Sequence, residues 1–367
     1  MMTSTLQPDN MGSYSREDVI FLLRDIGNVF LEMGNEKREQ LIQAGTHYSE
    51  MLPMEYQPSK TYMKLFYKTL DAFADRIAIA AGVVAERIVK SRGLENLILV
   101  SLARAGTPIG ILIKRYISMN YKVDVPHYSI SILRGRGFDE AAIRYILSEH
   151  PQGCLQFIDG WTGKGAITKE LIQSCQTFNE QYQTQLKADL AVLADPGHCA
   201  TIFGTREDFL IPSACLNSTV SGLVSRTVLN LQFMDKDDFH GAKYYKELED
   251  MDVSNLYINR IVACFKQVRN EITSQLQDEA TSLITWAGMK SVQNIQLDFD
   301  MENINLIKPG VGETTRVLLR RIPWKILINP QYKDELEHIL LLAHEKNVVL
   351  EEYSHMSYAC CGLIKEL

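Results

Sequence analysis

The sequence predicts an α/β protein with a parallel β-sheet, a helical cap before this sheet and a second, smaller α/β module at the carboxyl end. Two apolar runs, 97–102 and 155–158, each end in small residues and lead into a helical pattern. Strand–loop–helix units of this kind build parallel sheets whose strands are buried on both faces. After about residue 306, helical and strand patterns alternate again, which indicates a separate module.

Composition agrees with an ordinary globular protein. The chain has 367 residues, which is long enough for two domains, and is 46% hydrophobic and 23% charged. No apolar run approaches the ~20 residues that span a bilayer, and the amino terminus lacks the charged and apolar regions of a secretion signal. Seven cysteines without framework spacing indicate reduced thiols. We therefore expect a cytoplasmic protein that has no membrane partner.

The amino-terminal region predicts the helical cap. Residues 1–12 have no hydrophobic pattern and are expected to be disordered. From Arg16 to Leu31 the apolar residues recur at helical spacing. A longer amphipathic helix is expected from about Ser59 to Arg92, ended by Gly93.

The first strand–loop–helix unit spans Asn96 to Gly110 and places Arg104 in its loop. The next segment predicts a strand from Tyr128 to Leu133, followed by the mobile basic turn 134–137. Guanidinium groups pair well with phosphate oxygens, so Arg134 and Arg136 are candidate phosphate ligands. The alternatives are a surface charge on a connection for Arg104 and a solvated hairpin tip for the turn.

The segment 154–168 combines a strand, the acid Asp159, a glycine-rich turn and a helix that opens at Ala166. Small residues let backbone amides close around a phosphate, aided by the positive end of the following helix. Gly160 and Gly163 enclose only two residues, whereas the nucleotide-triphosphate P-loop requires four at that place. The alternative is a strand–turn–helix unit that binds no ligand.

This turn resembles the phosphoribosyl diphosphate (PRPP) motif of the type I phosphoribosyltransferases. The resemblance implies that Asp159 contacts the ribose hydroxyls, while Gly160 replaces the family's second acid. It also implies two phosphate loops. The 5′-phosphate loop comprises Thr162, Gly163, Lys164, Gly165 and Ala166. The diphosphate loop comprises Ser101, Arg104, Ala105, Gly106 and Thr107.

The resemblance further implies Mg²⁺ bound through PRPP, with no metal ligand expected from the protein itself. Arg104, Arg134 and Arg136 would stabilise the leaving diphosphate. The region beyond the ribose loop recognises the acceptor in that family. Its candidates here are Ser218, Ser221 and Arg226, and the alternative for the serines is a helix cap.

A narrower resemblance rests on 157–165 together with 13–23. These segments resemble the phosphoribosyltransferase-like proteins of bacterial tellurium-resistance and stress-response gene clusters, a group also labelled cysteine protease StiP. The similarity runs over most of residues 13–285. A cysteine protease requires a thiolate activated by histidine, and the candidates are Cys199, beside His198, and Cys215. No local signature of a known cysteine protease surrounds either cysteine.

The carboxyl-terminal region predicts a long helical stretch from about Ser254 to Trp286, then a small module at 293–367. In this module we expect a helix start at Gly310, strands at 324–328 and 348–353, a helix at 333–347 and a final helical turn at 357–364. The order resembles the L7Ae/Pelota-type RNA-binding domain. That resemblance implies RNA contacts by Gly310, Glu313, Thr314, Thr315 and Arg316, with further phosphate contacts by Arg320, Arg321 and Lys325. The alternative is a structural or dimerising module.

Taken together, the sequence predicts a transferase of the glycosyltransferase class that moves ribose 5-phosphate from PRPP to a base or nucleoside-like acceptor in a stress response. Its expected domains are a disordered 1–12, a phosphoribosyltransferase-like 13–285 and a Pelota-like 293–367. The first alternative is a non-catalytic regulatory protein that binds a phosphoribosyl ligand or RNA. The second is a cysteine protease. A homo-oligomer is also expected.

Overall fold

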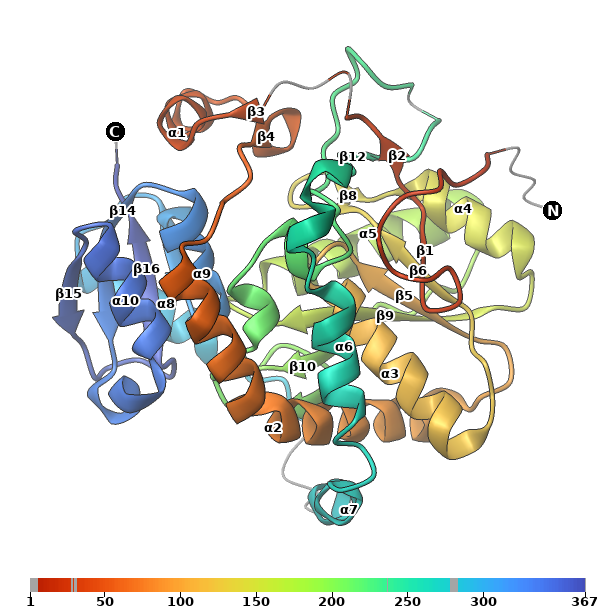
Figure 1. Ribbon diagram of the computed structural model, residues 1–367. Coiled ribbons are helices and arrows are strands. Elements are labelled where there is room, and N and C mark those ends of the chain that lie inside the picture. Colours follow the sequence, from red (N-terminus) through yellow and green to blue (C-terminus); the bar gives the residue numbers. More distant parts are fainter. Residues whose placement is uncertain (1–5, 28, 30–31, 236, 278–282, 367) are drawn as a thin grey trace.

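A computed structural model describes residues 6–27, 29, 32–235, 237–277 and 283–366. Its central feature is a six-stranded sheet in which every pair of neighbouring strands is parallel (Figure 1). The strand order is β1 (Ile20–Phe21), β6 (His127–Ile130), β5 (Leu97–Leu102), β9 (Cys154–Trp161), β10 (Leu190–Ala194) and β11 (Ile202–Thr205). The predicted α/β architecture with a parallel sheet is therefore confirmed.

Helices cover both faces of this sheet. One face is covered by α2 (Lys60–Arg92), α3 (Gly106–Tyr121) and α6 (Ser254–Val262), and the other by α4 (Glu140–Glu149) and α5 (Ala166–Tyr182). Consecutive side chains of β5 alternate between the two cores: Leu97 and Leu99 join the first, and Ile98 and Val100 the second. This alternation explains why the strand reads as one uninterrupted apolar run.

The long helix α2 has the predicted ends. Ser59 accepts a hydrogen bond from the Tyr62 amide, a cap that stabilises a helix by about 1 kcal/mol. At the other end Gly93 has a φ of 72°, and its amide donates to the Val89 carbonyl.

The helix expected from Arg16 to Leu31 is wrong. Ile20–Phe21 instead pairs with β6, and β2 (Arg24–Asp25) pairs with β12 (Gly241–Ala242). This edge position gives the segment backbone hydrogen bonds and leaves Leu22 and Leu23 fully buried. Residues 28, 30 and 31 of that prediction lie outside the described part. Within the expected disordered terminus, residues 6–12 have defined contacts: Asp9 pairs with Arg24 and Met11 is buried.

Shorter elements complete the first module (residues 6–277). They are β3 (Glu32–Met33), α1 (Asn35–Gln43), η1 (Tyr48–Glu50), β4 (Leu52–Pro53), the hairpin β7 (Ile132–Leu133) and β8 (Gly137–Phe138), η2 (Pro212–Ala214), η3 (Ser218–Val220), η4 (Lys246–Met251) and α7 (Arg269–Gln277). The single helix expected from Ser254 to Trp286 is therefore interrupted after Val262, and residues 278–282 lie outside the described part.

The second module (residues 287–366) has a four-stranded mixed sheet in the order β13-β16-β14-β15. Its elements are α8 (Ala287–Asp298), η5 (Ile304–Leu306), β13 (Ile307–Pro309), α9 (Val311–Arg320), β14 (Pro323–Ile328), η6 (Pro330–Glu335), α10 (Glu337–Glu345), β15 (Val349–Glu352) and β16 (Cys360–Ile364). The final helical turn predicted at 357–364 is wrong. Strand β16 lies inside the sheet and is wholly buried, which its continuous apolar pattern also allows.

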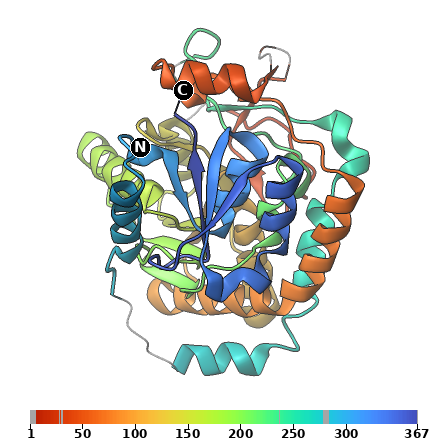
Figure 2. The same cartoon turned by 90° about the vertical axis from the view of Figure 1, so that its left-hand side faces the viewer.

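The two modules contact each other closely, on the left of Figure 1 and in the side view of Figure 2. Asp208 of the first module accepts hydrogen bonds from the amides of Val311, 2.9 Å, and Ala359, 2.8 Å. The Tyr358 hydroxyl donates to the Gly163 carbonyl, at 3.2 Å. None of the described helices is long and apolar enough to cross a membrane. The expected homo-oligomer stays a prediction.

Candidate anion-binding cleft between the two modules

A cleft of about 670 Å³ lies between the modules, and its walls carry a large excess of positive charge. Nine basic residues line it: Arg38, Arg104, Arg134, Lys164, Arg226, Lys308, Arg316, Arg320 and Arg321. Four acidic residues line it: Asp159, Glu302, Glu313 and Glu366. The chain as a whole has a net charge of −7, so this excess of cations is a local property of the cleft.

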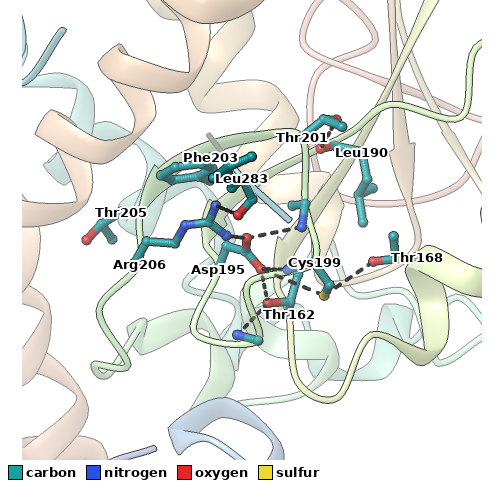
Figure 3. A network of polar contacts seen from close by, with 12 residues as sticks. Thr162, Thr168, Leu190, Asp195, Cys199, Thr201, Phe203, Thr205, Arg206 and Leu283 are labelled. Atoms are coloured by element: carbon teal, nitrogen blue, oxygen red, sulfur yellow. Dashed lines mark hydrogen bonds and ion pairs between the residues drawn. The ribbon is translucent and has the colours of Figure 1, made fainter. Parts of the chain in front are cut away.

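The loop 162–166 forms one wall, and a buried network holds its first residue (Figure 3). Thr162 follows β9; its amide donates to the Ala194 carbonyl at 3.0 Å and its hydroxyl donates to Asp195. Asp195 is fully buried, pairs with Arg206 and accepts hydrogen bonds from the amides of Cys199, 3.0 Å, and Ala200, 3.1 Å. The carboxylate thereby fixes the loop to the neighbouring strand end.

Two residues of this loop have special requirements. Gly165 has a φ of +82°, and a Cβ there would lie 2.3 Å from the Trp286 ring, so only glycine fits. Lys164 is 8% exposed, and its ammonium donates to the Ile304 carbonyl of the second module. Burial, assisted by Arg134, lowers the pKa of Lys164 to about 8. Helix α5 begins at Ala166, and residues of its first turn line the cleft.

Asp159 lies on the same wall and accepts a hydrogen bond from the Gly160 amide at 2.7 Å. Burial raises its pKa to about 6. Gly160 and Gly106 allow the loops after β9 and β5 to approach each other. A Cβ at Gly106 would lie 2.3 Å from the Ile158 carbonyl oxygen, and one at Gly160 would lie 3.1 Å from that of Ala105. A side chain at position 160 would therefore require Ala105 to shift by a few tenths of an ångström.

The predicted diphosphate loop is only partly at the cleft. Arg104 and Ala105 line it. Arg104 donates to the Val224 carbonyl, 3.1 Å, and the Asn217 side chain, 2.9 Å. Ser101 and Thr107 are fully buried and are bonded within the core, to His127 and Ser129 respectively.

Of the remaining candidates in the first module, Arg134 and Arg226 line the cleft and the other three do not. Arg226 lines the cleft with its guanidinium 4.6 Å from the centre of the Tyr48 ring, and Arg134 lies 5.6 Å from that ring. Arg136 pairs with Glu50 and donates to the Leu229 carbonyl at 2.9 Å, away from the lining. The hydroxyls of the other two acceptor candidates are bonded elsewhere: Ser218 donates to Glu55, and Ser221 to the Asn217 carbonyl.

Helix α9 and the residue after it place four of the predicted RNA-binding residues on the cleft wall: Glu313, Arg316, Arg320 and Arg321. Arg316 pairs with Glu313 at 2.7 Å and lies 4.5 Å above the centre of the Trp161 ring. Elsewhere, Thr314 and Thr315 are buried, Gly310 caps the helix, and Lys325 pairs with Glu351 at 2.7 Å outside the cleft. Gly312 packs on Trp161, where a Cβ would lie 2.3 Å from the ring.

The polar and aromatic cleft residues missing from the sequence prediction include Arg38, Tyr48, Trp161 and Lys308. Trp161 stands inside the glycine-rich turn and Lys308 stands two residues before Gly310, so their neighbourhood was a usable signal. Arg38 lies in the charged run 36–39, which is typical of a solvated helix face. Only its tertiary position, 2% exposed, reveals it.

The two candidate thiols lie in the core. Burial raises the pKa of Cys199 to about 11 and that of Cys215 to about 12. The Cys199 sulfur contacts the Thr168 hydroxyl at 3.6 Å and Asp195 at 3.8 Å (Figure 3). Among the described residues, no hydrogen bond joins a cysteine sulfur to a histidine ring. Both thiols are therefore protonated at neutral pH in this state.

A protein-held metal site was not expected, and in the described part of the chain no group of three or more His, Cys, Asp and Glu side chains is arranged to hold one. Mg²⁺ bound through a phosphorylated ligand stays a prediction. Asp159 lines the cleft together with the loop 162–166, and hard carboxylate oxygens suit that ion.

Comparison with known proteins identifies relatives of both modules. Residues 12–262 match the family described as tellurite-like stress resistance cysteine protease StiP, and residues 286–366 match the PELOTA RNA binding domain. The chain is 34% identical over 337 residues to the cysteine protease StiP of Acinetobacter baylyi, covering 86% of this chain and 84% of the relative. The family and the relative are both described as cysteine proteases, which contradicts the predicted phosphoribosyltransferase activity. That prediction is therefore wrong. The chain belongs to the StiP family.

Proposed function

We propose that the protein binds a phosphorylated ribonucleotide in the cleft between its modules, either within RNA or as a free nucleotide, as a regulatory binding protein. The observation that carries this proposal is that nine basic residues and four acidic residues line one cleft of an acidic chain. Arg38 and Lys164 are buried and form no ion pair with a described acid, and such cations favour an anion supplied from outside the protein.

The chemistry of the cleft favours a nucleotide over a simple anion. The rings of Tyr48 and Trp161 line it beside the cations, and bases stack on such rings. The Asp159 carboxylate accepts one protein hydrogen bond and has room to accept another from a ribose hydroxyl. Phosphate, base and ribose thus each have complementary groups on the same walls.

The match of the second module to an RNA-binding domain supports RNA as one source of this ribonucleotide. Glu313, Arg316, Arg320 and Arg321 face the cleft, so the module would contact RNA there together with the first module. A strand end or an unpaired segment fits this arrangement better than a duplex, because both modules border the cleft.

Binding is tested with the full chain by calorimetry, using a 5′-phosphorylated single-stranded RNA and adenosine 5′-monophosphate (AMP), each with and without Mg²⁺. We expect Arg316→Ala to weaken RNA binding about tenfold to a hundredfold, since a lost charged contact costs about 1.5–3 kcal/mol. Lys325→Ala is the matched control, because Lys325 lies outside the cleft. Tighter binding of the strand identifies RNA, and equal binding identifies the nucleotide. Wild-type protein that binds neither refutes the proposal.

A second candidate function, thiol-dependent proteolysis, comes from the printed descriptions of the family and the relative. Cys199 is the thiol beside the phosphate loop, since a Cβ at Gly165 would lie 3.2 Å from its sulfur. Proteolysis through Cys199 requires a rearrangement that lowers the thiol pKa from about 11. Cleavage of an unfolded protein substrate that is lost in both Cys199→Ala and Cys199→Ser, and kept in Cys215→Ala, would establish this activity.

A further inference from the structure

Three cleft arginines come from segments far apart in the sequence. Arg38 lies in α1, Arg226 lies in the connection before β12, and Arg320 ends α9 in the second module. Figure 2 shows α1 across the top of the molecule, beside the C-terminus. Helix α1 is held there by its neighbours: Glu39 pairs with Arg321 at 2.6 and 2.8 Å.

Within the described part of the chain, no direct ion pair joins these three side chains to an acid; Glu39 and Glu313 attract Arg38 and Arg320 without contacting them. Arg38 is 2% exposed; its Nη1 has only 3.4 Å contacts, with Asn35 Oδ1 and the Arg320 carbonyl, and its Nε has no partner. Arg226 has the Tyr48 ring as its neighbour. No hydrogen bond or ion pair from the Arg320 guanidinium was found to a described residue.

Adjacent arginines in the same cleft are paired. Arg321 makes a two-bond contact with Glu39, and Arg316 pairs with Glu313. The fold therefore supplies acids to some cations of the cleft and leaves this cluster without them. Arg38 is buried and the other two are half-buried, so these guanidinium groups repel each other at a cost that a bound anion would remove.

The cluster is distinct from the phosphate loop in its electrostatic neighbours. Burial and then repulsion from Arg38 lower the pKa of Arg226 to about 9. Burial and then Arg134 and Lys164 lower the pKa of Lys308 well below its usual value. Lys164 donates to the Ile304 carbonyl, whereas Arg38 contacts the Arg320 carbonyl at 3.4 Å. Arg226 and Arg134 lie against the same Tyr48 ring, so the two groups of cations adjoin each other there.

We propose that Arg38, Arg226 and Arg320 form a second anion subsite, which binds a second phosphate of the ribonucleotide whose first phosphate lies at the loop 162–166. This subsite rests on the proposed function and specifies the ligand further. A single nucleotide within RNA carries phosphates on both sides of its ribose, and a 3′,5′-bisphosphate reproduces that pair. Guanidinium groups match such oxygens in geometry and charge.

The test compares binding of AMP and adenosine 3′,5′-bisphosphate to the full chain by calorimetry. We expect the wild type to bind the bisphosphate at least tenfold tighter than AMP. Arg38→Met and Arg226→Met should each reduce this ratio toward one, whereas Lys164→Met should weaken both ligands and keep the ratio. Lys325→Met is the control outside the cleft.

If both arginine variants keep the wild-type ratio of bisphosphate affinity to AMP affinity, the second subsite is refuted, and the proposed function is not. A wild type that binds neither compound overturns both. Thermal unfolding without ligand supplies a second readout, because removing one of several repelling cations should raise the melting temperature. A lower melting temperature in both variants would instead assign the arginines a structural role and contradict the subsite.

Discussion

Asp159→Asn tests whether the charged Asp159 side chain in the cleft lowers the free energy of unfolding. The Asp159 carboxyl has a pKa of about 6 against an ordinary 3.8, with burial as the main cause. A difference of about 2 units corresponds to roughly 3 kcal/mol of disfavoured ionisation. Partial exposure of the side chain to the cleft screens the charge and reduces this to about 1–2 kcal/mol.

The sign of the effect follows from linkage. A carboxyl with a raised pKa binds its proton more tightly in the folded state, so stability falls as the pH rises from about 4 to 6 and stays low above 6. The neutral amide of Asn removes this cost. Without ligand, Asp159→Asn should therefore stabilise the protein at pH 8 by about 1–2 kcal/mol, and by less at pH 5.

Urea unfolding of wild type and variant at pH 5 and pH 8 measures this difference. Both samples should unfold with the same dependence on denaturant, so the midpoint shift reports stability directly. A variant that is less stable than the wild type at pH 8, or a shift that is the same at both pH values, refutes the reasoning. Binding of the ribonucleotide should fall in the same variant.

Three further predictions concern the parts that position the cleft. Asp208→Ala removes two hydrogen bonds to amides of the second module and should reduce the free energy of unfolding by about 3–5 kcal/mol. The melting temperature should fall; an unchanged value would contradict a role for Asp208 in holding the modules together. Gly165→Ala meets the Trp286 ring at a positive φ and should unfold at lower urea and bind RNA more weakly; normal binding would contradict the loop geometry. Arg206→Met leaves Asp195 buried without its cation and should destabilise the fold by about 3–5 kcal/mol in urea unfolding, and a neutral result would contradict the network of Figure 3.

The elements predicted from the sequence were those whose local residue pattern indicates the same structure that they adopt in the folded protein. Strands β5 and β9 are apolar runs buried on both faces, and α2 carries its own caps, so each was evident from the sequence. Ile20–Phe21 was misassigned because its apolar residues also fit a helical period. The segment forms a strand because it pairs with the edge of β6, and the local sequence gives no sign that this edge is available.

The site was predictable where loops follow strands and not where distant segments meet. Asp159 lies near the carboxyl end of β9 and Lys164 follows that strand, and the carboxyl end of a parallel strand is a common ligand position. Arg38 comes from a helix whose sequence resembles a solvated surface, so its place in the cleft depends on the contact of α1 with the second module. The predicted reaction was wrong for a related reason: a loop sequence typical of phosphate binding leaves the chemistry open.

The most direct test of the central claim is to locate bound RNA by photo-crosslinking. Single-stranded RNA that contains 5-iodouridine would be crosslinked to the full chain, and the linked peptides would be identified by mass spectrometry. We predict crosslinks at Tyr48 and Trp161, the two rings that line the cleft, with competition by AMP or by excess RNA. Crosslinks confined to the outer face around Trp324, which is 41% exposed, would contradict the account.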